Sequence, residues 1–210
     1  MNAVQFISTL LIGYLFGCFQ TSYFISRKFS KKDIREMGSG NAGASNVTSE
    51  MGWKFGILTG VTDVLKAFIP AKLILFIFPV AYPQVALELM IIAGMGAVLG
   101  HIYPFFMDFR GGKGVACYIG MILAIDWQIG VAAIIFLIVL TIITDYVSIA
   151  SILLYVIIPC LAYYSDNYSD TVIACLLILL VIGVGKHWVN IQNLLAGNET
   201  GFRSVFKKNK

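Results

Sequence analysis

The sequence predicts an all-α protein that crosses a membrane several times. Its 210 residues are 59% hydrophobic and only 12% charged, and its mean hydropathy is +0.85, whereas soluble domains average roughly 45–50% apolar residues. The apolar residues are gathered into long stretches, and most of the basic residues lie between them. These observations favour a polytopic integral membrane protein, and we expect residues 1–210 to form one membrane-embedded domain.

Seven apolar segments are predicted to form helices, with boundaries uncertain by a few residues. They cover residues 3–25, 54–79, 84–107, 113–126, 129–146, 148–164 and 170–187. A span needs about 20 apolar residues, so the fourth segment is short and is expected to be tilted or only partly inserted. A count of five or six spans therefore stays open. The first segment follows no basic residue and is followed by Arg27 and Lys28, which predicts an uncleaved span rather than a signal peptide.

The basic residues predict an outside N-terminus and a cytoplasmic C-terminus. The 15 Lys and Arg residues lie mainly in or beside the first loop (Arg27, Lys28, Lys31, Lys32, Arg35, Lys54), in the third loop (Arg110, Lys113) and at the C-terminus (Lys186, Arg203, Lys207, Lys208, Lys210). Basic residues mark the cytoplasmic side, so three polar, glycine-containing stretches are all expected there. The net charge of +4 suits anionic lipids or substrates. Nucleic acid is not expected, because the basic residues are not set among stacking aromatics.

The first polar stretch has the closely spaced glycines of an anion-binding loop. Residues 38–43 match the dinucleotide pattern GxGxxG, but no strand precedes them, so a dinucleotide site is not expected. Closely spaced glycines let backbone N–H groups turn toward an anion, and nearby hydroxyl and amide groups add neutral donors. The candidates for phosphate or substrate binding are Gly38, Gly40, Asn41, Ser45 and Asn46, with Ser39 as a candidate catalytic residue. An ordinary solvated loop is the alternative.

The second polar stretch runs from Gly100 to Gly114 and ends in a Gly-Gly-Lys-Gly turn. It is not a Walker A motif, because Gly114 stands where Ser or Thr should follow the lysine. Lys113 begins an apolar segment and is predicted to bind phosphate as a point charge beside a helix N-terminus, together with Gly111 and Gly112. No acid follows His101 at position 106, so a His–Asp catalytic pair is not expected, and a structural hydrogen bond is one interpretation of this histidine.

The third polar stretch contains His187 and Asn190, which are three residues apart and therefore share a helix face. Both are candidate catalytic residues. His187 is predicted to donate to a substrate or to act as a general base near neutral pH. A structural histidine at a helix end is the alternative interpretation.

Charged residues inside the second apolar segment point to a polar site or an internal ion pair. A charge deep in lipid costs about 2.5–3.5 kcal/mol on insertion scales, so Asp63 and Lys66 are expected to face a polar cavity or each other. Lys66 is a candidate phosphate-binding residue, with an ion pair that only locks helices as the alternative. Asp145 and Ser148 flank another helix junction and are expected to reach the same cytoplasmic pocket, with Ser148 as a binding candidate. The four cysteines have neither metal-ligand spacing nor a disulfide framework, so no metal is expected.

Together these stretches resemble one family, the bacterial acyl-phosphate:glycerol-3-phosphate acyltransferases (PlsY). The matching segments are residues 38–46, 63–66, 100–116, 145–152 and 186–199. The resemblance implies an integral enzyme of the bacterial inner membrane, with seven spans and a cytoplasmic active site. It implies transfer of a fatty acyl group from acyl phosphate to the 1-hydroxyl of glycerol 3-phosphate, giving lysophosphatidic acid for phospholipid synthesis. No metal or bound cofactor is implied, and protein partners are not indicated.

Position by position, the resemblance implies substrate-binding or catalytic roles for Ser39, Asn41, Ser45, Lys113, Ser148 or Ser151, His187 and Asn190. The chain departs from the family pattern at Gln20, which replaces a proline, at Ser49 and Asp145, which replace arginines, and at Gln192-Asn193, which replaces a Lys-Arg pair. Three of these changes remove positive charge. An Arg–phosphate hydrogen bond is worth about 1.5–3 kcal/mol, so affinity for glycerol 3-phosphate is expected to suffer.

The predicted chemistry is direct attack of the acceptor hydroxyl on acyl phosphate, without an acyl-enzyme. Phosphate is a good leaving group, so the protein must mainly hold two anions together and stabilise the developing charge. Neither a Ser-His-Asp arrangement nor a base beside Cys117 is visible. Two alternatives stay open, a silent paralogue that acts as a membrane regulator or assembly partner, and a small-anion transporter.

Overall fold

The computed structural model describes residues 2–78, 82–165 and 167–207, with side chains through Ser204. Residues 79–81, which include the first two positions of the predicted loop 80–84, and Asp166, Lys208 and Lys210 lie outside this part of the chain. All regular structure within the described residues is helical. The predicted all-α fold class is therefore confirmed.

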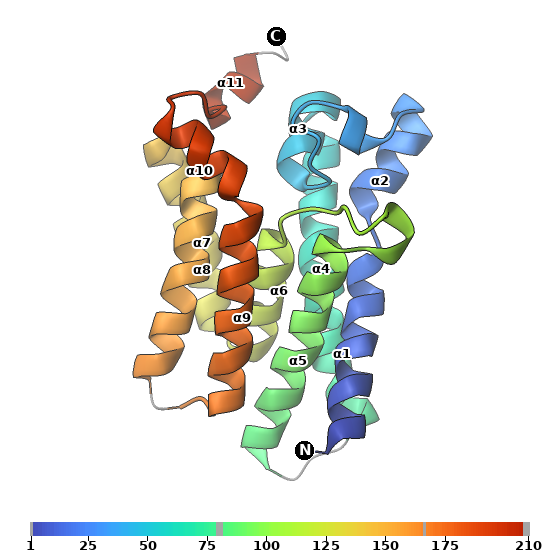
Figure 1. The fold of residues 1–210 in the computed structure, drawn as a ribbon, viewed down its shortest axis with the longest axis vertical. Helices are drawn as coiled ribbons and strands as arrows, with labels where there is room; N and C mark the ends of the chain where they lie inside the picture. The colour runs from blue at the N-terminus through green and yellow to red at the C-terminus, as the bar shows by residue number, and fades with distance from the viewer. Residues whose placement is uncertain (1, 79–81, 166, 208–210) are drawn as a thin grey trace. The chain divides into compact units, whose positions relative to one another are not determined.

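The chain divides into two compact units, Met1–Trp127 and Gln128–Lys210, which are described separately. Unit 1 contains α1 (Ala3–Cys18), α2 (Thr21–Ile25), η1 (Ser26–Ser30), η2 (Ile34–Glu36), α3 (Ala44–Met51), α4 (Trp53–Ile77), α5 (Pro83–Ile102), η3 (Phe105–Met107) and α6 (Val115–Ile125) (Figure 1). Unit 2 contains α7 (Trp127–Thr144), which begins at the boundary, then α8 (Val147–Tyr164), α9 (Asp170–Lys186), α10 (Trp188–Leu195) and α11 (Phe202–Lys207).

The predicted helix over residues 3–25 is wrong in one respect, because it is broken. α1 ends at Cys18 and α2 begins at Thr21, while Phe19 and Gln20 between them have extended backbone. Neither glycine nor proline stands at this break. Its cause is a contact from another helix, which is described with the candidate site.

Four helical segments of the described chain are long and apolar enough to cross a membrane: Ala3–Ser30, Pro83–Met107, Trp127–Thr144 and Val147–Tyr164. The pair α9 and α10, bent by 52°, makes a fifth if it is one span. α4 has 25 residues but contains Lys54, Asp63, Lys66 and Lys72. α6, with 11 residues, is about 16 Å long and too short for a core of about 30 Å. The count of seven spans stays a prediction.

Small residues bring α1 and α5 into close contact along their lengths. Added Cβ atoms at Gly13 and Gly17 would lie 1.9 and 2.0 Å from carbonyl oxygens of α5. Conversely, Cβ atoms at Gly96 and Gly100 of α5 would lie 2.2 and 2.1 Å from carbonyl oxygens of α1. Each helix thus presents a Gly-x-x-x-Gly pair to the other, the arrangement by which membrane helices let their backbones approach.

α5 is the central helix of unit 1, because it packs against α1, α4 and α6. It is continuously buried from Leu89 to Val98. Side chains from α4, α5 and α6 form an apolar cluster of Ala71, Ile74, Leu89, Met90, Ala93 and Ala124. The polar segments that precede α3 and follow α5 lie together at one end of this unit (Figure 1).

Unit 2 contains a packed pair of helices, α8 and α9. They approach closely at Gly183, where a Cβ would lie 2.6 Å from the ring of Tyr155. α7 buries little, with only Gly130, Ala133 and Thr141 among its buried residues. Most of its apolar surface therefore suits contact with lipid.

Gly96→Ala should destabilise the protein by about 1–3 kcal/mol, the usual cost of overpacking, because its methyl group would meet the Leu10 carbonyl. The clash must exceed the roughly 1 kcal/mol that alanine gains over glycine in helix propensity. Gly185→Ala in α9 is the matched control, since its Cβ would have no neighbour within 4 Å. Thermal unfolding in detergent measures both variants. Equal unfolding temperatures would contradict the close α1–α5 contact.

Candidate active site

The first polar stretch forms an exposed turn that leads into α3. Gly38 and Gly40 have φ values of +52° and +71°, in the left-handed region that glycine adopts without strain. Ser39 and Ser45 are exposed, and Asn41 is half-buried. α3 begins at Ala44 after Gly43, which supplies no capping side chain, so the positive end of the helix dipole faces this turn without a side-chain cap.

Asn46 organises this turn from inside. Its amide nitrogen donates to the carbonyls of Ile34, Met37 and Asn41 at 3.2, 2.9 and 3.0 Å, and its amide oxygen accepts from the N–H of Ser39 at 3.0 Å. The side chain is buried. Because these contacts use its polar atoms, we revise the expected role of Asn46 from substrate donor to support of the loop.

Arg35 joins the segment just before the first polar stretch to the second polar stretch. It pairs with Asp33 at 2.9 Å and donates to the Met107 carbonyl at 2.7 Å. Burial alone would raise the pKa of Asp33, but the hydrogen bonds and charge of Arg35, with a smaller contribution from Arg27, hold it below its ordinary value of 3.8. The two loops at this end of unit 1 are therefore fixed to each other by a partly buried charge network.

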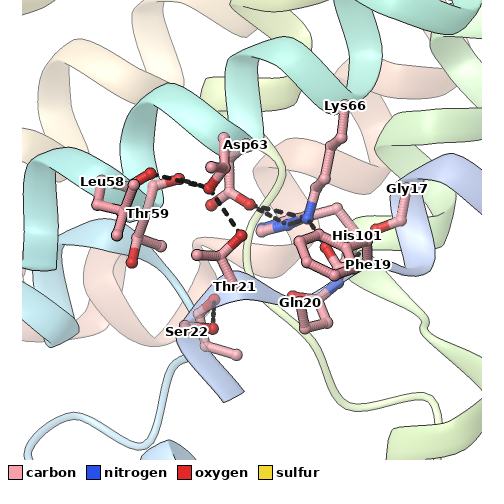
Figure 2. Close-up of polar contacts among 12 residues, drawn as sticks. Gly17, Phe19, Gln20, Thr21, Ser22, Leu58, Thr59, Asp63, Lys66 and His101 are labelled. Atoms are coloured by element: carbon pink, nitrogen blue, oxygen red, sulfur yellow. Dashed lines mark hydrogen bonds and ion pairs between the residues drawn. The ribbon is translucent and has the colours of Figure 1, made fainter. Parts of the chain in front are cut away.

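Asp63, Lys66 and His101 form a buried triad in unit 1 (Figure 2). The Lys66 Nζ atom lies 2.8 Å from Asp63 Oδ1, 2.8 Å from His101 Nδ1 and 2.7 Å from the Phe19 carbonyl oxygen. An ammonium group has three donors, and these three acceptors account for all of them. The expected phosphate-binding role of Lys66 is therefore replaced by an internal one, the alternative that the sequence left open.

The protonation of Lys66 and that of His101 are linked. When Lys66 is charged, its ammonium donates to Nδ1, and His101 is then neutral with its proton on Nε2. The negative charge that compensates Lys66 is Asp63.

Lys66 explains the break between α1 and α2. Its bond to the Phe19 carbonyl gives that oxygen a partner outside the helix. Gln20 donates from Nε2 to the carbonyls of Gly17 and His101, both at 3.2 Å. The break is thus stabilised by side chains that sequence periodicity could not connect with it.

The Gly-Gly-Lys turn rests against His101. The N–H groups of Gly111 and Gly112 donate to the carbonyls of Ile102 and His101 at 3.0 and 3.1 Å. These two N–H groups are therefore engaged within the protein, and the predicted phosphate cradle at Gly111 and Gly112 is revised to a supporting role. Lys113 lies directly after them, and Gly114, with φ of +86°, precedes α6 and supplies no capping side chain. Lys113 is thus next to a helix N-terminus, as predicted.

One group in the described chain has metal-ligand chemistry, Asp63, His101 and Cys117, whose ligand atoms lie within 4.8 Å of one another. The ammonium of Lys66 contacts both the carboxylate and the imidazole nitrogen. A divalent cation would have to displace this built-in positive charge, so the arrangement of donors fits a metal poorly.

In unit 2, His187 lies at the bend between α9 and α10 and is buried. Its Nδ1 atom is 2.7 Å from the Gly183 carbonyl oxygen, which can only accept. The proton of a neutral His187 is therefore on Nδ1, and the basic lone pair is on Nε2.

Ser148 and Asn190 both bind Glu199. The Ser148 hydroxyl and the Asn190 amide nitrogen each donate to Glu199 Oε1 at 2.7 Å. The structure thus brings together two predicted residues of unit 2 through the carboxylate of Glu199, for which the sequence predicted no role. The sequence signal was present, since Glu199 belongs to the third polar stretch.

Asp145 anchors the start of α11. It has φ of +69°, its carbonyl accepts from the Phe202 N–H at 2.6 Å, and its carboxylate accepts from the Arg203 N–H at 2.8 Å. The Arg203 side chain reaches the Ile142 carbonyl at 2.8 Å and lies 3.8 Å from the Asp145 carboxylate. Asp145, expected to line the pocket with Ser148, is used to fix this segment.

Comparisons with known proteins agree over almost the whole chain. A family model described as glycerol-3-phosphate acyltransferase matches residues 7–197. Glycerol-3-phosphate acyltransferase 1 of Oceanobacillus iheyensis is 34% identical over 98% of this chain and 99% of its own length. The glycerol-3-phosphate acyltransferase of Shouchella clausii is 37% identical over 93% of this chain and 95% of its own length.

Solved structures agree as well. The glycerol 3-phosphate form of PlsY (YgiH), an integral membrane glycerol 3-phosphate acyltransferase, matches with a TM-score of 0.83 and 31% identity, over 94% of this chain and 95% of the other. The lysophosphatidic acid form matches with a TM-score of 0.81 and 29% identity, over 96% and 98%.

Asp33→Asn should lower the free energy of unfolding at neutral pH by about 1.5–3 kcal/mol, the range for hydrogen bonds to charged groups. Because the pKa of Asp33 is lowered in the folded state, its stabilisation is complete above the unfolded value of 3.8 and is lost as pH falls through the folded value. Unfolding of wild type and variant, measured from pH 7 down to pH 3, should show a gap that narrows in acid. A gap independent of pH would contradict this charge pairing.

Asp145→Ala should release the start of α11, because both the carboxylate and a residue suited to left-handed backbone are lost. Limited trypsin digestion, with cleavage after Arg203 followed by mass spectrometry, should be faster than in wild type. Asp145→Asn is the matched control, since asparagine tolerates this conformation and keeps an oxygen acceptor for the Arg203 N–H. Equal cleavage of the alanine variant and wild type would argue against the anchor.

Proposed function

The chain belongs to the glycerol-3-phosphate acyltransferase family, and we propose that it transfers a fatty acyl group from acyl phosphate to the 1-hydroxyl of glycerol 3-phosphate. The hydroxyl oxygen attacks the acyl carbon, the bond from that carbon to the phosphate oxygen breaks, and lysophosphatidic acid and inorganic phosphate leave. The hydroxyl proton passes to a base.

The observation that supports this function best is the similarity, over more than nine-tenths of both chains, to an integral membrane acyltransferase solved with glycerol 3-phosphate and with lysophosphatidic acid. These are the acceptor and the product of the proposed reaction. The similarity favours an acyltransferase over a silent regulator or a small-anion transporter, the two alternatives suggested by the sequence.

We propose that phosphate groups bind at the polar end of unit 1. Lys113 supplies a positive charge beside the N-terminus of α6, where the helix dipole favours an anion. The exposed Gly38–Gly40 turn, with Ser39, Asn41 and Ser45, supplies neutral donors beside the uncapped N-terminus of α3. Lys66, Gly111, Gly112 and Asn46 support this end from inside.

In unit 2, we propose that His187 takes the proton from the acceptor hydroxyl. The hydrogen bond from Nδ1 to Gly183 orients the ring and leaves Nε2 as the basic atom, the usual way in which a second partner sets a histidine tautomer. Ser148 and Asn190, held by Glu199, would help to bind substrate.

No acyl-enzyme is proposed. Cys117 is fully buried and lies with Asp63 and His101, where burial in apolar surroundings opposes formation of a thiolate. Acyl phosphate already has a good leaving group, so positioning and electrostatic stabilisation are sufficient.

We also propose that the protein lies in the bacterial inner membrane, with its N-terminus outside and these polar ends cytoplasmic. The basic residues between Arg27 and Lys54 and those near the C-terminus mark the cytoplasmic side. The exposed aromatics Phe105, Phe106 and Phe109, beside the second polar stretch, are typical of the membrane–water interface.

Lys113→Ala should lower transfer from palmitoyl phosphate to labelled glycerol 3-phosphate by roughly 100-fold or more, the usual effect of removing one group that stabilises developing charge. The assay uses purified protein in lipid and measures labelled lysophosphatidic acid. Lys72→Ala is the matched control, because Lys72 is exposed and lies on α4 rather than in the turn before α6.

Full activity of the Lys113→Ala variant would remove its phosphate-binding role. Folded wild-type protein that forms no product would overturn the proposed reaction and favour the silent-paralogue alternative.

A further inference from the structure

We propose that Asp63, Lys66 and His101 act as a positioning unit, which sets the place of Lys113 by giving the Gly111–Gly112 backbone a fixed surface to rest on. This inference depends on the proposed role of Lys113 in binding phosphate. It assigns a function to three buried polar residues that the proposed reaction does not use directly.

The first step is that His101 is held on both sides. Its ring Nδ1 atom lies within hydrogen-bond distance of the Lys66 Nζ atom, at 2.8 Å. Its backbone carbonyl accepts from Gly112 at 3.1 Å and from the side chain of Gln20 at 3.2 Å. The residue is only 3% exposed, so ring and carbonyl form one rigid surface at the end of α5.

The second step is that the turn fits this surface without room for a side chain. A Cβ at Gly112 would lie 2.1 Å from His101 Nε2, and a Cβ at Gly111 would lie 1.9 Å from the His101 carbonyl oxygen. Neither glycine has a positive φ, so close approach, rather than backbone conformation, requires glycine here. A movement of the His101 ring must therefore move the backbone that leads into Lys113.

The third step is that the ring orientation depends on the charge pair. Lys66 contacts Asp63, His101 and the Phe19 carbonyl at once (Figure 2). Without its ammonium, the buried Asp63 carboxylate would lose its cation, an arrangement that is strongly unfavourable. Lys66 and Asp63 are therefore positioning residues, which act on Lys113 through His101.

A double-mutant cycle tests this chain of contacts. Gly112→Ala should raise KM for acyl phosphate or glycerol 3-phosphate by about tenfold or more, with a smaller change in kcat, because contacts between neighbours give coupling energies of this order. In a His101→Ala background the space under Gly112 is open, so the same substitution should have little further effect. Gly185→Ala, with no neighbour within 4 Å of its Cβ, is the control.

His101→Asn checks the contribution of Lys66. An asparagine oxygen can accept from the ammonium in place of Nδ1. The KM of this variant should therefore lie between that of the wild type and the raised KM of His101→Ala. Thermal unfolding of every variant in detergent shows that the proteins compared are folded.

Inorganic phosphate gives a readout that needs no turnover. The rise in unfolding temperature that phosphate causes in the wild type should vanish in Lys113→Ala and shrink in Gly112→Ala. Independent, additive effects of Gly112→Ala and His101→Ala on KM and on this shift would overturn the positioning proposal, while the acyltransferase function would stand. Absence of lysophosphatidic acid from the wild type would instead defeat the proposed function. The positioning proposal would then be tested by the double-mutant cycle measured through the phosphate-induced rise in unfolding temperature.

Discussion

The polar end of unit 1 depends on one physical constraint, the burial of a charged pair in an apolar helix. Asp63 and Lys66 are almost fully buried on α4. A buried ammonium is tolerated only when its donors are satisfied, and Lys66 finds acceptors on three different segments, α4, α5 and the Phe19–Gln20 break. Satisfying one charge therefore specifies where the first helix breaks and how the end of α5 is oriented.

Glycine serves two distinct purposes around this site, and only one of them is local. Gly38 and Gly40 adopt left-handed backbone within their own turn, a requirement that a short polar stretch rich in glycine already suggests. Gly111 and Gly112 are needed because the end of α5 lies against them. A sequence pattern alone assigns both pairs to anion binding, since it contains no information about the surface that the second pair touches.

The same distinction decides how much of the molecule could be predicted from sequence. Apolar segments are a local signal, and the helices begin and end within a few residues of the predicted limits. The break at Phe19 was missed because its cause is a lysine 47 positions away. His101 and Glu199 were undervalued for a similar reason. Their partners are distant in the chain, and a single histidine or glutamate has no periodicity to mark it. A buried lysine needs hydrogen-bond acceptors, and this need was the clue that the sequence offered. His101, at the end of a neighbouring apolar segment, was a candidate acceptor.

Asp145 shows that the charge of a site depends on the residues that lie near it in the fold as well as on the residue at each sequence position. The sequence suggested that an aspartate in place of arginine weakens the anion-binding capacity of this chain. In unit 2 the carboxylate is not an isolated negative charge, because the Arg203 guanidinium lies 3.8 Å away and the backbone N–H of Arg203 donates to the same carboxylate. Two further bonds, from Phe202 to the Asp145 carbonyl and from Arg203 to the Ile142 carbonyl, fix this arrangement. The sequence alone indicates a net loss of positive charge at this junction. In the structure, Asp145 instead holds a basic residue of the C-terminal segment, Arg203, at the same place.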